Sequence, residues 1–105
     1  MNILFICSRN QWRSRTAETI FKDHGIHRVK SAGTENNARI KVTEKLLQWA
    51  ELIFVMEKRH KQRLEERFER AIQDKKIIIL NIKDNYQYMD AELIESLTIS
   101  VKPYF

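Results

Sequence analysis

Short apolar runs alternate with amphipathic segments along most of the chain. Four segments are predicted to be strands, three of them apolar runs rich in β-branched residues and one of them, Arg28–Gly33, a short segment of mixed composition. They are Ile3–Ile6 with Cys7 at its end, Arg28–Gly33, Leu52–Met56 and Lys76–Leu80. Elsewhere, apolar residues recur at helical spacing. The predicted helices run from Thr16 to about Asp23-His24-Gly25, over Glu44–Trp49, through the charged segment after Glu57–His60, and over Ala91–Leu97.

Strands and helices therefore alternate in the order β-α-β-α-β-α-β before the last helix, which predicts an α/β fold. With right-handed crossovers, this order gives a three-layer, doubly wound domain with a four-stranded parallel sheet. The 105 residues are enough for one core, so we expect a single domain over residues 1–105. In such sheets, ligands bind beyond the carboxyl ends of the strands.

Glycines and helix-capping residues refine the boundaries of these elements. We expect Gly25 to cap the first helix and Thr43 to begin the second. Gly33 marks a close backbone approach or a positive φ. Thr98–Phe105 is predicted to be an apolar strap across the core, with an end that anchors the last helix or meets a partner.

The formal charge of +5 and the pI of about 9.5 favour anionic partners. Basic residues concentrate between Arg9 and Arg15 and between Lys58 and Arg70. Glutamates interleave with the second cluster, as expected for a solvated helix face. The first cluster surrounds a potential anion site.

No apolar run reaches the roughly 18–20 residues that span a membrane, and no signal-peptide pattern is present. A single cysteine suits the reducing cytoplasm. His24 and His27 lack clustered cysteine or carboxylate neighbours, so we expect no metal site and no cofactor.

The segment from Cys7 to Ser14 concentrates the chemistry of the chain. Cys7 ends a strand, and Arg13 and Ser14 follow immediately before a helical pattern. Converging loop amides and the helix dipole would form an anion cradle, in which a thiol should ionise readily. A lone cysteine in such a place is also a common small core residue. The Cys-x5-Arg spacing favours catalysis, because one loop can surround a tetrahedral oxyanion while Arg13 binds two of its oxygens.

Other loop residues fit this interpretation. The Ser14 hydroxyl can donate to the thiolate, and Asn10 tolerates left-handed backbone geometry. The residues expected to bind substrate are Ser8, Arg9, Asn10, Gln11, Trp12 and Tyr86. Trp12 and Tyr86 are the aromatic walls in this set, although Trp12 could instead pack on its own helix.

The loop resembles that of the low-molecular-weight protein tyrosine phosphatases, especially their short bacterial relatives. The similarity continues through Ser31-Ala32-Gly33-Thr34, Ala38-Arg39, Leu52–Glu57 and Asp84-Asn85-Tyr86. It implies a metal-free phosphatase that acts through a cysteinyl-phosphate. It also implies that Ser31 supports Asn10, although Ser31 could simply end a strand.

The resemblance further implies that Asp84 is the general acid, because the family has Asp-Pro-Tyr at this loop. Phosphoester cleavage needs such an acid to protonate the leaving oxygen. Asp90 is the competing candidate, but its simpler role is to cap the last helix. Two departures from the family are a shortened segment before the second helix, which leaves one side of the cleft open, and Asn36 in place of a histidine.

The sequence is compatible with more than one substrate class. The resemblance points to phosphotyrosyl proteins, whereas the basic rim of Arg9, Arg15 and Arg59 also suits phosphorylated RNA or nucleotides. Arsenate reduction is disfavoured because no second cysteine could resolve an adduct on Cys7. A catalytically idle anion-binding module is disfavoured by the joint presence of Cys7, Arg13, Ser14 and Asp84. The sequence does not define an oligomeric state.

Overall fold

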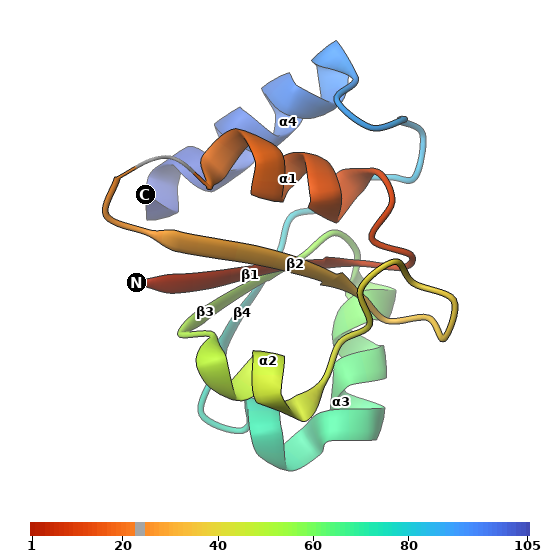
Figure 1. Cartoon of the computed structure of the whole chain (residues 1–105), viewed down its shortest axis with the longest axis vertical. Coiled ribbons are helices and arrows are strands. Elements are labelled where there is room, and N and C mark those ends of the chain that lie inside the picture. Colours follow the sequence, from red (N-terminus) through yellow and green to blue (C-terminus); the bar gives the residue numbers. More distant parts are fainter. Residues whose placement is uncertain (23–24) are drawn as a thin grey trace.

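A central parallel sheet carries helices on both faces in the computed structural model, which describes residues 1–22 and 25–105 (Figure 1). The strands are β1 (Asn2–Cys7), β2 (Arg28–Gly33), β3 (Leu52–Val55) and β4 (Lys76–Ile79). The helices are α1 (Arg13–Phe21), α2 (Glu44–Trp49), α3 (Lys58–Ile72) and α4 (Ala91–Val101), followed by a 3₁₀ turn over Lys102–Tyr104. The predicted three-layer α/β class with a four-stranded parallel sheet is confirmed.

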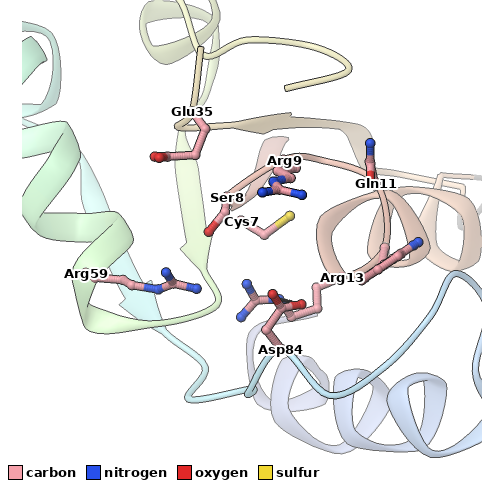
Figure 2. A pocket seen from close by; sticks show the side chains of 9 residues that line it. Cys7, Ser8, Arg9, Gln11, Arg13, Glu35, Arg59 and Asp84 are labelled. Carbon is pink, nitrogen blue, oxygen red and sulfur yellow. Dashed lines mark ion pairs between the residues drawn. The ribbon is translucent and has the colours of Figure 1, made fainter. Parts of the chain in front are cut away.

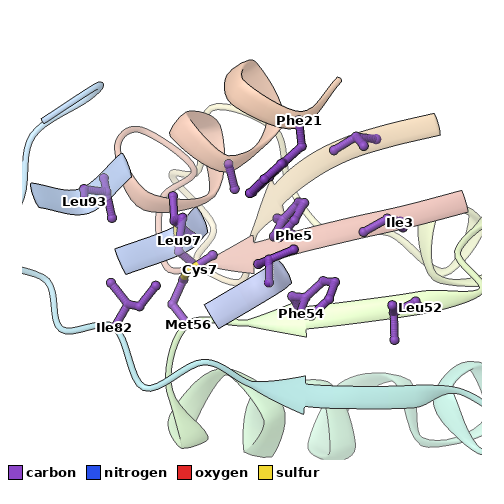
Figure 3. Packing of buried hydrophobic residues seen from close by; sticks show 13 residues of the cluster. Ile3, Phe5, Cys7, Phe21, Leu52, Phe54, Met56, Ile82, Leu93 and Leu97 are labelled. Carbon is purple, nitrogen blue, oxygen red and sulfur yellow. The ribbon is translucent and has the colours of Figure 1, made fainter. Parts of the chain in front are cut away.

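The two faces of the sheet carry separate cores because side chains alternate along a strand. On β1, Ile3, Phe5 and Cys7 face α1 and α4 (Figure 3). Leu4 and Ile6 face the opposite layer, which α2 and α3 cover. Every residue from Ile3 to Cys7 is buried, as expected for a central strand of a parallel sheet.

The strand order is β2-β1-β3-β4, so β1 has a partner on each side. The chain winds from β1 outward to β2 and then returns to the other side of β1 as β3. This reversal creates a crevice beyond the carboxyl ends of β1 and β3, which is where doubly wound sheets bind ligands. Cys7 is the last residue of β1, and Glu57 lies two residues after the end of β3.

The predicted boundaries agree with the structure within a few residues, with three corrections. Helix α1 starts at Arg13 rather than Thr16, ends at Phe21, and has Lys22 as its C-cap residue rather than Gly25. Gly25 does have a positive φ of 65°, while Asp23 and His24 lie outside the described residues. Strands β3 and β4 each end one residue before their predicted limits.

The carboxyl-terminal segment differs most from its prediction. Thr98–Val101 continue α4 instead of forming an extended strap, since the apolar spacing of the helix persists through Val101. Beyond the 3₁₀ turn, the Phe105 ring packs against Phe21, and the Tyr104 ring packs edge-on against Phe54. The predicted anchoring by this end is therefore present. None of the described helices has the length and apolar character needed to cross a membrane.

Candidate active site

The loop between β1 and α1 wraps its backbone around the Cys7 sulfur. Asn10 has a positive φ of 56°, the left-handed geometry predicted for it, and its backbone N–H lies 3.3 Å from Cys7 Sγ. Ser14 Oγ lies 2.9 Å from the same sulfur. Cys7 is 3% exposed and belongs to the core, yet it also lines a surface pocket. The core and site interpretations of this cysteine are both compatible with its position.

A buried network holds the loop in this shape. The side-chain amide of Asn10 donates to Ser14 Oγ at 2.7 Å and to Ser31 Oγ at 2.8 Å. The contact with Ser31 is the one that the family resemblance implied. The Ser31 hydroxyl in turn donates to the Glu18 carboxylate, and Arg39 Nε donates to the Asn10 carbonyl at 3.1 Å. Because Ser14 Oγ accepts a hydrogen bond from Asn10, its own O–H can donate either to the Cys7 sulfur at 2.9 Å or to the more distant Ala32 carbonyl at 3.4 Å.

Arg13 is buried at the first turn of α1, with 2% of its side chain exposed. Its Nη1 donates to Glu57 Oε2 at 2.6 Å and to the Ile82 carbonyl at 2.8 Å. Its Nε lies 3.6 Å from Asp84 Oδ1. Partial burial raises the pKa of Glu57, but hydrogen bonds and charges from Arg13 and Arg59 outweigh this effect, so the pKa is lowered overall. Glu57 therefore remains ionised and fixes the guanidinium.

His60 supports the opposite side of the loop. It is 1% exposed, its Nε2 lies 2.9 Å from Ser8 Oγ, and its Nδ1 accepts the Glu57 backbone N–H at 3.0 Å. Burial and the nearby positive charges of Arg13 and Arg59 lower the pKa of His60 to about 4. The imidazole is therefore neutral near pH 7.

These groups surround a pocket of about 270 Å³ (Figure 2). The residues lining it are Cys7, Ser8, Arg9, Gln11, Trp12, Arg13, Glu35, Arg59 and Asp84. Figure 2 shows Cys7 beside the loop and Asp84 beside Arg13, with Arg59 reaching in from α3. Trp12 is 42% exposed and so offers part of its ring at the pocket.

The two candidate acids occupy different places. Asp84 lines the pocket with half of its side chain exposed. Asp90 accepts the Glu92 backbone N–H at 2.9 Å as the N-cap of α4 and is not among the lining residues. The geometry therefore favours Asp84 for chemistry at Cys7.

Three residues of the predicted site or its basic rim lie elsewhere. The Tyr86 ring packs against the core and borders a separate depression, so it forms no wall of this pocket. The Arg15 guanidinium lies 4.4 Å from the centre of the Tyr88 ring instead of joining the basic rim. Asn10 is fully buried beneath the loop, so its side chain shapes the site without lining it.

Sequence reasoning assigned no role to several supporting residues. They are Glu18, Glu35, Arg39, Glu57 and His60. A usable signal existed for two of them, because Glu57 and His60 follow a strand end and are spaced as an N-cap and third helical residue. Among residues 1–22 and 25–105, no group of three or more His, Cys, Asp or Glu side chains could hold a metal ion.

Comparison with known proteins finds a family resemblance in the amino-terminal part of the chain. Residues 2–47 match the sequence profile of a family described as low molecular weight phosphotyrosine protein phosphatase. No curated protein matches the sequence in a direct search.

Solved structures share the fold over nearly the whole chain. The tyrosine phosphatase Wzb from Escherichia coli K30, solved with phosphate, is 21% identical with a TM-score of 0.81, covering 98% of this chain and 94% of its own. The YwlE arginine phosphatase from Geobacillus stearothermophilus is 20% identical with a TM-score of 0.72, and the match covers 98% of this chain and 92% of the YwlE chain. A YwlE mutant with a phosphorylated active-site serine is 22% identical with a TM-score of 0.72, and the match covers 99% of this chain and 96% of the mutant chain.

The family match covers the segment that contains the Cys7 loop, Ser31 and Arg39, and the structural likeness extends the fold to the rest of the chain. The resemblance inferred from the sequence is thereby confirmed: residues 2–47 match the profile of the low molecular weight phosphotyrosine protein phosphatases, a family of cysteine-dependent phosphatases, and the chain shares the fold of solved tyrosine phosphatases such as Wzb.

Proposed function

We propose that this chain hydrolyses phosphomonoesters through a covalent phosphate on Cys7. The observation that carries the proposal is the convergence of Cys7, Arg13 and Asp84 on one pocket, with Ser14 2.9 Å behind the sulfur. A phosphorylated active-site serine in the YwlE mutant supports the same chemistry, because a serine there accepts the phosphoryl group that the proposal gives to a cysteine.

The Cys7 thiolate attacks phosphorus, and the bond between phosphorus and the leaving oxygen breaks. Asp84 donates a proton to that oxygen. A water molecule, deprotonated by Asp84, then attacks the phosphocysteine and releases inorganic phosphate. The Ser14 hydroxyl stabilises the thiolate as it forms again. Amides from Ser8 to Arg13 bind the phosphoryl oxygens throughout.

The contacts of Arg13 suit it to transition-state binding. Glu57 and the Ile82 carbonyl occupy Nη1, which uses two of the five guanidinium N–H groups. Nε lies 3.6 Å from Asp84 Oδ1, beyond hydrogen-bond distance. We infer that a phosphoryl group replaces this long ion pair and binds the N–H groups on Nε and Nη2 in a two-pronged arrangement. Since Glu57 and Ile82 hold the guanidinium before substrate arrives, little ordering cost falls on the reaction itself.

A Cys7→Ser variant tests the covalent step. We expect it to bind inorganic phosphate as tightly as the original protein, because the amides and Arg13 remain, and to lose hydrolysis of an aryl phosphate. Calorimetric titration with phosphate and a steady-state assay measure the two properties. Undiminished turnover in Cys7→Ser would refute the covalent mechanism.

Phosphotyrosyl proteins are the first substrate class that we propose. Wzb, a tyrosine phosphatase, shares the fold, and the partly exposed Trp12 ring lies where a substrate ring could pack beside the scissile phosphate.

Phosphorylated RNA or nucleotides are a second candidate, favoured by the arginines of the pocket. Arg9 and Arg59 accompany Arg13 among the lining residues, and Trp12 could stack on a base. The same positive charges disfavour the cationic side chain that an arginine phosphatase must accept. Parallel assays with a phosphotyrosyl peptide, a phosphate-bearing oligoribonucleotide and a phosphoarginyl peptide separate these classes by kcat/KM.

We further propose that residues 1–105 act as one domain in the cytoplasm, where a reducing environment preserves the Cys7 thiol. Limited proteolysis tests the first point, since a single folded unit should yield no stable internal fragment.

A further inference from the structure

The buried contact between His60 and Ser8 has no role in the mechanism above. His60 is on α3, Ser8 is on the loop after β1, and the two side chains meet at 2.9 Å. His60 is 1% exposed, whereas Ser8 lines the pocket next to Cys7 (Figure 2). The contact therefore connects a buried ring to a hydroxyl at the candidate phosphate site.

The neighbours of the ring define which nitrogen carries the proton. His60 Nδ1 lies 3.0 Å from the backbone nitrogen of Glu57, and a backbone N–H can only donate. Nδ1 must therefore accept, and the proton of the neutral ring is on Nε2. Nε2–H then donates to Ser8 Oγ, so the hydrogen bond has a defined direction.

This direction leaves the Ser8 hydroxyl proton available. Ser8 Oγ accepts from His60, and its O–H can donate to another acceptor. The loop uses a similar arrangement at Ser14, whose hydroxyl accepts from Asn10 and lies closer to the Cys7 sulfur, at 2.9 Å, than to its other acceptor, the Ala32 carbonyl, at 3.4 Å. In both cases a buried N–H group orients a hydroxyl on the wall of the site.

We propose that His60 orients the Ser8 hydroxyl as a hydrogen-bond donor to the phosphoryl group in the Cys7 pocket. Ser8 then belongs to the substrate-binding machinery, and His60 is a positioning residue that acts through it. This inference rests on the proposed phosphatase function and adds a side-chain donor to the loop amides and Arg13. The alternative is that the pair only fastens α3 to the loop.

Variants of the two residues separate these possibilities. Ser8→Ala removes the hydroxyl, and Ser8→Thr retains it. His60→Gln removes the ring but preserves the helix start, because glutamine at the third helical position can also accept the N-cap N–H in a capping box. The double variant, Ser8→Ala with His60→Gln, completes the cycle.

We expect Ser8→Ala to lower kcat/KM for an aryl phosphate, and its affinity for inorganic phosphate, by about ten- to a hundredfold, as for a lost hydrogen bond to a charged group. Ser8→Thr should lose much less. His60→Gln should reduce both quantities in the Ser8 background and have little further effect in the Ser8→Ala background. Nitrogen NMR of His60 should show a protonated Nε2 and an unprotonated Nδ1.

An active protein whose kcat/KM and phosphate affinity are unchanged by Ser8→Ala would overturn this inference while leaving the proposed function intact. Fully additive effects of Ser8→Ala and His60→Gln would also overturn it, since His60 would then not act through Ser8. If the original protein binds phosphate but hydrolyses no phosphoester, the proposed function fails, and the phosphate titrations still decide the role of Ser8. If it does neither, both proposals fail.

Discussion

Cys7 belongs to two environments at the residue scale. Its position on β1 places its backbone and Cβ in the core that faces α1 and α4, while the turn of the chain after it surrounds the sulfur with polar groups. Hydrogen bonds from the backbone N–H of Asn10 and from the Ser14 hydroxyl would offset the free-energy cost of burying a thiolate. A small buried side chain and a nucleophile are thus compatible at this one position.

The first prediction concerns the general acid. Asp84→Asn removes the exchangeable proton near the leaving oxygen, so we expect kcat for an alkyl phosphate to fall by about 10²–10⁴-fold. An aryl phosphate with a good leaving group should be affected less, because it needs less protonation. Steady-state kinetics with both substrates provide the measurement.

Asp90→Asn is the matched control for this prediction. Asparagine caps helices as well as aspartate does, so α4 should retain its stability, and Asp90 lies outside the pocket. Activity should therefore be unchanged. A larger loss in Asp90→Asn than in Asp84→Asn would show that the acid has been assigned to the wrong residue.

The second prediction follows from the buried ring of His60. Its pKa is about 4 in the folded protein against an ordinary value of 6.5. Between these values the unfolded chain binds a proton that the folded chain does not, so the free energy of unfolding falls as the pH decreases from 6.5 to 4. The decrease in the free energy of unfolding over this pH range should be on the order of 3 kcal/mol.

Urea unfolding between pH 4 and pH 8 measures this dependence. His60→Gln has no titrating ring and should lack the acid-induced component, which makes it the internal comparison. If the original protein and His60→Gln lose stability in parallel over this pH range, His60 is not the group responsible.

Individual site residues were predictable to different degrees. Cys7, Arg13 and Ser14 were found because their roles depend on spacing within one loop. Glu57 and His60 were assigned no role because their partners, Arg13 and Ser8, are far away in sequence and only the pairing of β3 with β1 brings them together. Tyr86 was wrongly expected at the pocket, because the sequence does not show on which side of its loop a ring will pack.

At the scale of elements, the junction of β1 and α1 depends on the end of β2. Gly33 pairs with Cys7, and a Cβ atom there would lie 2.5 Å from the Ser8 carbonyl oxygen and 2.7 Å from Ala38 Cβ. The backbone of the loop and the Ala38 side chain therefore occupy the space that a side chain at position 33 would need. This confirms the close approach that the sequence predicted at Gly33.

The third prediction is that Gly33→Ala displaces the loop. We expect a stability loss of about 1–3 kcal/mol from overpacking and weaker binding of inorganic phosphate. Gly25→Ala is the control, because it creates strain at a positive φ of 65° but meets no atom within 4 Å. It should lower stability without changing phosphate binding, and equal phosphate binding in both variants would contradict the prediction.

Elements were the most predictable level. Hydrophobic periodicity identified four strands and four helices in the correct order, because the spacing of apolar residues within each segment is a local property of the sequence. The strap expected over Thr98–Phe105 was wrong for Thr98–Val101, because the apolar residues Ile99 and Val101 suit either an extended or a helical segment. Only packing against α1 and the sheet decides between them.

At the scale of the whole molecule, charge and shape bear on the substrate. The net charge is +5, and three arginines line a pocket that also contains Glu35 and Asp84. The positive electrostatic potential from these charges attracts phosphorylated ligands in general, and it attracts ligands with several phosphates most strongly.

The fourth prediction separates pocket charge from total charge. If phosphorylated RNA is a substrate, Arg9→Gln and Arg59→Gln should each weaken its binding and reduce the salt dependence by about one phosphate contact. Arg70→Gln removes an equal charge from the far end of α3, outside the pocket, and should have little effect. Equal effects of all three changes would indicate non-specific attraction.

The most direct measurement is intact-protein mass spectrometry after acid quenching of a reaction between the Asp84→Asn variant and an aryl phosphate. This variant should form the phosphocysteine with a good leaving group but hydrolyse it slowly, so we expect one added phosphoryl group, located on Cys7. Introducing Cys7→Ala into the same variant should abolish the adduct. An active enzyme with no adduct, or with one at another residue, would contradict covalent catalysis by Cys7.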